Sequence, residues 1–155
     1  MSNEDLLQPT LSEFRKPPSL YNSTGFFLSS FFGGPVGAGL YALANSYRLG
    51  RLAADLPAII AFVAAAFLLL TELHLSGLLR ELSTFLGGSL SRNMEIFLRV
   101  SGMACFAAIY FMHRVFFRAA RVTGVAARAG WVPGIVAVLV GVAANIAFTA
   151  WIAHH

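Results

Sequence analysis

The chain has 155 residues, of which 57% are hydrophobic and only 12% are charged, and its formal net charge is +4. Soluble globular domains carry about 25% charged residues, so this composition excludes an ordinary water-soluble fold. The basic residues lie almost wholly between apolar stretches, and no stretch is long and polar enough to form a nucleic-acid-binding module. We therefore expect no nucleic-acid partner.

Four apolar segments, each about long enough to cross a bilayer, dominate the sequence. A transmembrane helix needs about 20 predominantly apolar residues, and long apolar runs without the alternation of barrel strands favour helices. We predict an all-α integral membrane protein, a four-helix bundle over residues 20–155. Residues 1–19 are rich in charge and proline, which predicts a flexible tail. The predicted membrane spans are 20–44, 56–75, 97–117 and 132–152.

The first apolar segment is interrupted near its middle by glycine and proline. Pro35 lacks a backbone donor and the glycines around it loosen a helix, so the sequence predicts a kink. Small residues also recur at every fourth position, which lets another backbone approach closely. Its partner is either one of the chain's own helices or another subunit. The predicted helix-packing residues are Ser30, Gly33, Gly34, Gly37, Ala38, Ala42, Gly141 and Asn145.

The first segment also carries a family resemblance. Residues 32–40 read FGGPVGAGL and residues 45–50 read NSYRLG. This pattern resembles one in uncharacterised small bacterial inner-membrane proteins, in which a glycine- and proline-rich first helix ends in a similar exit. The resemblance covers about a fifth of the chain. It implies a location in the bacterial cytoplasmic membrane and implies no activity.

Helix signals surround the second apolar segment. Asp55 is expected at the N-cap of its helix, with Pro57 in the first turn. Beyond residue 75, apolar residues at helical spacing continue to Leu86, which predicts a short helix lying in the membrane surface. Gly87 and Gly88 are expected to end this short helix.

The third apolar segment has charged residues at both ends. Glu95 and Arg99 lie at positions i and i+4 near its start, which predicts a local ion pair. Its far end and the following loop are basic and contain no acidic residue, which predicts a surface for anionic lipid headgroups. The predicted headgroup residues are Arg114, Arg118, Arg121 and Arg128.

Two tryptophans bracket the fourth apolar segment. Trp131 and Trp151 are about 30 Å apart along a helix, which matches the thickness of the hydrocarbon core. We expect both to anchor the helix at the membrane interfaces. Small and polar residues between them recur at every fourth position and are expected to face protein. These residues are Ala137, Gly141, Asn145 and Thr149.

Basic residues also predict an orientation. Four crossings would place both termini on the same side of the membrane. The first and third loops would hold six basic residues, and the tail with the second loop five. Because the third loop holds four basic residues and no acidic one, the positive-inside rule places it in the cytoplasm. Both termini are then expected in the periplasm.

Few titratable side chains are placed where chemistry could use them. Ionisable groups are missing from the centres of the predicted segments, where transport usually places them. His74 and His113 are expected at opposite membrane faces, too far apart to hold a haem together. A group of His and Glu residues near the predicted outer boundary is the minimum for a divalent metal site, but it lacks recognised ligand spacing. That group is Glu72, His74, Glu95, His154 and His155.

We assign no catalytic residue, metal ligand, cofactor or enzymatic activity from the sequence. The pattern favours an accessory, assembly or structural subunit of a membrane complex, or a homo-oligomer, that associates through small-residue helix packing. Its expected partners are membrane lipids, including anionic headgroups, and other membrane subunits or copies of itself. One alternative is a small transporter or pore lined by the kinked first helix, with Glu72 and His74 at its entrance. A second alternative is a metal- or lipid-dependent membrane enzyme that uses the outer polar group.

Overall fold

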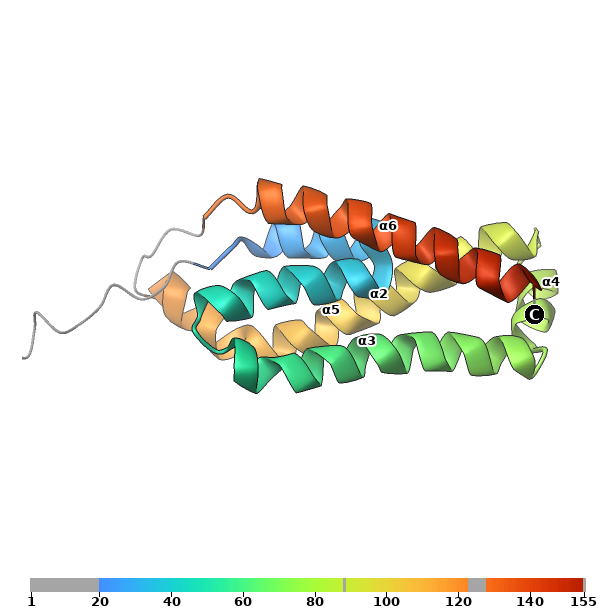
Figure 1. Ribbon diagram of the computed structural model, residues 1–155, viewed down its shortest axis with the longest axis horizontal. Coiled ribbons are helices and arrows are strands. Elements are labelled where there is room, and N and C mark those ends of the chain that lie inside the picture. Colours follow the sequence, from blue (N-terminus) through green and yellow to red (C-terminus); the bar gives the residue numbers. More distant parts are fainter. Residues whose placement is uncertain (1–19, 88, 123–127, 155) are drawn as a thin grey trace, which may run out of the picture.

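The structure, a computed structural model, describes residues 20–87, 89–122 and 128–154; the predicted tail at 1–19 and His155 lie outside these ranges. Within them the fold is all-α, as predicted (Figure 1). Four of the helices are long and apolar enough to span a membrane, and α4 is the short one. The five helices are α2 (Ser23–Arg48), α3 (Leu52–Leu75), α4 (Leu78–Leu86), α5 (Leu90–Val122) and α6 (Trp131–His154).

α2 is broken near its middle. Gly34 has φ 61° and ψ −152°, far from helical values. This region of backbone space is open to glycine because it has no Cβ. Pro35 follows, and it has no N–H to donate into the preceding turn. The predicted kink is therefore confirmed.

The break is sharp enough to fold the two halves of α2 against each other (Figure 1). The Tyr41 hydroxyl donates to the Asn22 carbonyl at 2.9 Å. The Tyr21 amide donates to Asn45 Oδ1, also at 2.9 Å. The rings of Phe26 and Tyr41 stack with their centroids 5.5 Å apart. In a straight helix Asn22 and Tyr41 would be about 28 Å apart, so both ends of α2 lie at the same end of the molecule.

The sequence predicts residues 20–44 as one kinked span, and the structure folds this segment into a hairpin. The described chain has three helices that run the length of the molecule, α3, α5 and α6, around a hairpin. The Arg128 amide donates to the Leu20 carbonyl at 2.9 Å, which places Leu20 beside the start of α6. α6 then carries the chain to the opposite end, where His154 lies. Leu20 and His154 thus lie at opposite ends of the molecule, whereas four full-length helices in series would bring the two ends of the domain together. Hydropathy cannot distinguish a full-length helix from a hairpin of equal length.

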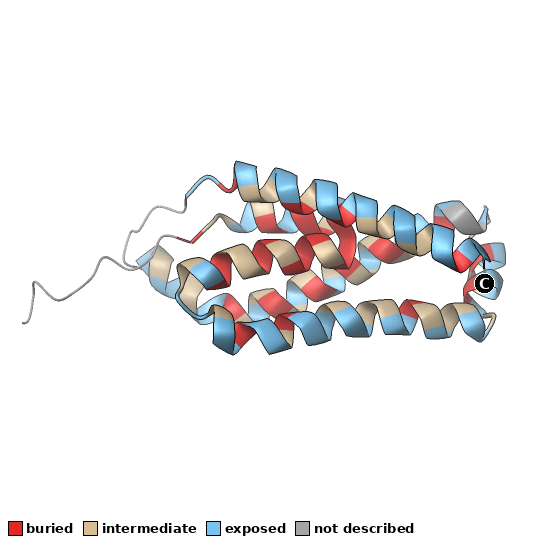
Figure 2. Ribbon diagram, in the orientation of Figure 1, coloured by how far each residue is buried: buried red, intermediate tan, exposed pale blue. Residues whose placement is uncertain are grey.

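The hairpin occupies the centre of the bundle (Figure 2). In the most apolar window of each helix, 61% of the residues of α2 are buried, against 11% for α3 and 17% for α6. The main apolar cluster joins both halves of the hairpin to its neighbours through Phe26, Tyr41, Ile59 and Ile109. α3, α5 and α6 therefore surround α2 and present their remaining apolar side chains outward.

A second apolar cluster closes the end of the bundle that the hairpin does not reach. Leu70, Leu79, Met94, Leu98 and Ile152 join α3, α4, α5 and α6 there. The predicted short helix is confirmed as α4, although a turn at Ser76 and Gly77 separates it from α3, and Gly87 with φ 67° ends it. α5 begins earlier and ends later than the predicted span 97–117.

Candidate functional site

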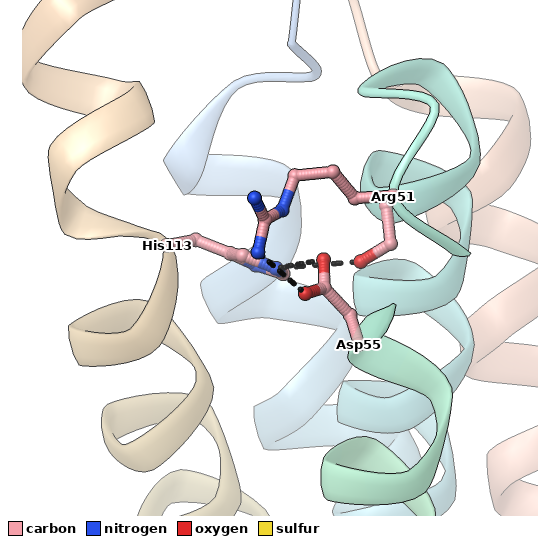
Figure 3. Close-up of polar contacts among 4 residues, drawn as sticks. Arg51, Asp55 and His113 are labelled. Atoms are coloured by element: carbon pink, nitrogen blue, oxygen red, sulfur yellow. Dashed lines mark hydrogen bonds and ion pairs between the residues drawn. The ribbon is translucent and has the colours of Figure 1, made fainter. Parts of the chain in front are cut away.

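Polar side chains from α2, α3 and α5 meet near the open end of the hairpin. His113 Nε2 lies 3.0 Å from Asp55 Oδ2 and 3.3 Å from Ser46 Oγ. These three residues are at most 4% exposed. The half-exposed Arg51 reaches the other carboxylate oxygen of Asp55 at 3.5 Å (Figure 3). We call Ser46, Arg51, Asp55 and His113 the Asp55–His113 cluster.

The start of α3 places Asp55 in this cluster. Arg51 is the N-cap, with its carbonyl accepting from the Asp55 amide at 3.0 Å. The prediction of Asp55 as the N-cap is therefore wrong, because the helix begins one turn earlier, directly after the turn at Gly50. Pro57 correspondingly lies in the second turn. An acidic residue in a first turn is stabilised by the helix dipole, and from this position Asp55 faces His113.

The serine, histidine and aspartate of the cluster do not form a hydrolytic triad. In such a triad the serine and the carboxylate contact opposite nitrogens of the imidazole: one nitrogen takes the serine proton, and the carboxylate at the other orients the ring and stabilises its charged form. Here both Ser46 and Asp55 contact Nε2 of His113. Ser46 is also fully buried, which keeps a substrate from its hydroxyl.

The cluster instead connects three helices. A charged side chain in the apolar part of a membrane protein is costly unless it is paired. The carboxylate of Asp55 lies beside Arg51 and His113, and the Arg51 guanidinium also lies over the Phe116 ring at 5.0 Å. Ser46 brings the exit of the hairpin into the same network. The arrangement holds the end of α2 against α3 and α5.

The predicted helix-packing residues surround the break in α2. A Cβ on Gly141 would lie 2.6 Å from the Cα of Gly33, so α6 touches α2 backbone to backbone. A Cβ on Gly33 would lie 2.9 Å from the Ala137 carbonyl oxygen. Gly37 packs against the Ser29 carbonyl oxygen, which belongs to the other half of the hairpin. These residues thus contact the chain's own helices.

The remaining predicted packing residues lie in or beside the same region. Ser30, Ala38 and Ala42 are fully buried in α2. A residue that the pattern did not identify, Gly102 of α5, completes the contact, because a Cβ there would lie 2.6 Å from Gly34 Cα. Its one signal in the sequence is that it is an isolated glycine within a helical segment.

Asn145 lies at the tip of the hairpin. Its carboxamide is so close to Gly34 that a Cβ there would lie 2.7 Å from Nδ2. Its Oδ1 is buried and has no hydrogen-bond partner among the described residues. Asn145 lines a cleft of about 580 Å³ together with Glu95, Arg99 and Thr149. An unpaired polar atom therefore lies where the helix of α2 is broken.

The predicted headgroup residues lie at the open end of the hairpin. Arg114, Arg118 and Arg128 are exposed, and Arg121 lies in the last turn of α5, with its side chain outside the description. Arg128 is joined to the start of the chain by a backbone bridge to Tyr21. The structure therefore brings the four arginines to one end of the molecule.

The candidate metal group does not gather in the described part of the chain. No three His, Cys, Asp or Glu side chains come close enough there to hold a metal ion. Glu95 forms the predicted ion pair with Arg99. Glu72 and His74 lie at the C-terminal end of α3, His154 is exposed at the end of α6, and His155 lies outside the described residues.

Comparison of the chain with protein-family models, with curated proteins and with solved structures gave no match.

Proposed function

We propose that the protein is a non-enzymatic accessory, assembly or structural subunit in the bacterial cytoplasmic membrane, acting in a larger complex or as a homo-oligomer. Its four apolar helices support a membrane location. The bacterial assignment comes from the resemblance in residues 32–50.

In this proposal the chain crosses the membrane three times, and α2 enters and leaves on one side. Non-helical backbone is tolerated at membrane depth only where protein or a water-filled cavity surrounds it. The break at Gly34 meets this condition, because Gly102 of α5 and Gly141 of α6 contact α2 there. A re-entrant hairpin therefore fits both the geometry and the cost of unpaired amides in lipid.

The hairpin also changes the balance of basic residues between the two membrane sides. Six arginines lie at the open end of the hairpin or in its connections, and Arg15 with Lys16 precedes Leu20 in the sequence. Three arginines, Arg80, Arg92 and Arg99, are left for the other side. A distribution of eight against three favours a cytoplasmic N-terminus and a periplasmic C-terminus, replacing the expectation of two periplasmic termini.

The observation that carries the subunit proposal is an outward-facing apolar cleft of about 420 Å³ between α3 and α5. We call it the α3–α5 cleft. Small side chains on both helices leave its floor open for the bulky side chains of another helix. The small lining residues are Ala65, Ala66, Ser101, Ala104 and Ala108.

Native mass analysis after mild detergent extraction tests this proposal. We expect a second copy or a stoichiometric partner subunit to remain bound. Ala104→Trp fills the α3–α5 cleft and should release the bound subunit, whereas Ala107→Trp, at another exposed position of α5 outside the cleft, should not. A strictly monomeric protein, or equal behaviour of the two variants, would contradict the proposal.

A small transporter or pore is a second candidate, because Oδ1 of Asn145, beside the broken helix, has no hydrogen-bond partner within the described part of the chain. Broken helices at mid-membrane form substrate sites in many transporters. The cleft that contains Asn145 is lined by Glu95 and Arg99 and not by Glu72 or His74, so Glu95 and Arg99 would form the entrance. In liposomes, this candidate expects flux that is lost in Asn145→Leu and kept in Glu72→Gln. Absence of flux in the wild-type protein would remove it.

A further inference from the structure

A second outward-facing groove lies between the first half of α2 and α6, and its volume is about 270 Å³. We call it the α2–α6 groove. Three glycines line it, and two of them, Gly25 and Gly130, pack so closely on the Tyr41 hydroxyl that an added Cβ would collide with it. The third, Gly134, faces the Tyr41 ring. Its walls are almost entirely apolar and include Leu28, Phe32, Ile135, Val138 and Leu139.

The groove is about one leaflet deep. On α6 it runs from Trp131 to Leu139, and on α2 from Asn22 to Phe32. At 1.5 Å per residue these lengths are about 12 and 15 Å, close to half of a hydrocarbon core of about 30 Å. The mouth is polar and carries an exposed tryptophan, as expected at a membrane interface. The groove therefore reaches from one interface to the middle of the bilayer.

The surroundings of the mouth are strongly basic. Arg128 is exposed and its backbone pairs with residues 20–22, directly beside the groove residues Asn22 and Gly130. Arg48 lies over the neighbouring Tyr21 ring at 4.7 Å. In the described chain the acidic residue at this end is Asp55, which is buried and paired with His113. The charge at the mouth thus complements an anionic group.

We propose that the α2–α6 groove binds one acyl chain of an anionic phospholipid from the cytoplasmic leaflet, with its phosphate beside Arg128. An apolar slot of leaflet depth accepts a lipid tail, and arginine at the interface attracts an anionic headgroup. The site rests on the three-crossing topology and does not depend on the partner proposed for the α3–α5 cleft.

Lipid competition on the delipidated protein tests the site. The purified full-length chain is titrated with phosphatidylglycerol and with phosphatidylcholine of the same acyl chains, and bound lipids are counted by native mass analysis. We expect one phosphatidylglycerol to be retained in preference. Arg128→Gln should lower this preference about fivefold, the effect of one basic residue near the surface. Arg80→Gln, an exposed arginine at the other end, should leave it unchanged.

Filling the groove separates a seated lipid from general lipid contact. Ile135 and Val136 are neighbours on α6 with similar exposure, 56% and 53%, but Ile135 lines the groove and Val136 does not. Ile135→Trp should abolish retention of the lipid, and Val136→Trp should preserve it. Both positions are exposed, so both variants should fold, and a measurement of their helix content checks this. Equal retention in the two variants would overturn the proposal.

Two further outcomes would also overturn it. Equal binding of the two lipids to the wild-type protein would show that no anionic headgroup is selected. A photo-cross-linker at position 135 that captures a protein subunit, instead of lipid, would assign the groove to a polypeptide. If the Ala104→Trp variant loses a partner subunit but retains the lipid, the result concerns the α3–α5 cleft and not the α2–α6 groove.

Discussion

His113 of α5 lies 3.0 Å from Asp55 of α3, although 58 residues separate them in the sequence. Both side chains are nearly inaccessible, at 1% and 4% exposure. The pair therefore joins two long helices at the end of the molecule where the hairpin opens. Ser46 contacts the same imidazole nitrogen and so ties the hairpin to this pair.

Removal of either member of this pair should destabilise the fold. In His113→Ala the buried carboxylate of Asp55 loses its closest partner, and in Asp55→Ala the imidazole loses its own. Breaking a buried pair costs about 3–5 kcal/mol. Unfolding in detergent should show that the free energy of unfolding falls by about this amount in each single variant. In the double variant it should fall by less than the sum of the two single losses.

The exposed pair of Glu95 and Arg99 supplies the control for this prediction. Glu95 is 62% exposed, and surface ion pairs contribute about 0–1 kcal/mol. Glu95→Ala should therefore change the free energy of unfolding by less than about 1 kcal/mol. Equal losses at the two pairs would show that the Asp55–His113 contact does not hold the helices together.

Two glycines of α6 offer a matched test of the contact between α6 and the hairpin. A Cβ at position 141 would lie 2.6 Å from Gly33 Cα, whereas one at position 134 would meet its nearest atom at 3.7 Å. Gly141→Ala should lower the free energy of unfolding by about 1–3 kcal/mol, because two backbones must separate. Gly134→Ala should be neutral or stabilising by up to about 1 kcal/mol, since alanine favours a helix. The thermal midpoints of the two variants measure the difference.

The break in α2 depends on glycine at position 34. Its φ of 61° with ψ −152° is strained for any other residue, at a cost of about 1–3 kcal/mol. An added Cβ would also collide with Asn145. Gly34→Ala should therefore destabilise more than Gly50→Ala, where φ is also positive, at 67°, but no atom lies within 4 Å. Chemical unfolding of both variants checks the order, and the reverse order would contradict the hairpin.

The sequence predicted the helices well because length and hydropathy are local properties. The kink at Gly34 and Pro35 was also predictable, but its consequence was not. A helix bent by a few tens of degrees and a helix folded back on itself have the same composition. The hairpin forms when the second half packs more favourably on the first half than it would as a continued helix in the far leaflet. Tyr41 supplies this packing, because its ring stacks on Phe26 and its hydroxyl donates to the Asn22 carbonyl.

The candidate site was less accessible from the sequence. Local neighbours predict Asp55 only as a capping residue, and they place His113 only at one membrane face. Their contact arises from helix packing between segments that no spacing rule connects. Gly102 was missed for the same reason. By contrast, the pair of Glu95 and Arg99 was predicted because it lies within one helix turn.

The path of α2 is tested most directly by labelling single cysteines in intact cells with a membrane-impermeant maleimide. Cys105 is first replaced by alanine, and cysteine is then placed at three exposed positions, Ser23, Tyr47 and Ala153. A re-entrant hairpin with three crossings predicts labelling at position 153 without permeabilisation, and labelling at positions 23 and 47 only after it. Labelling that places positions 23 and 153 on one side and position 47 on the other would show that α2 crosses the membrane, and would contradict the hairpin topology.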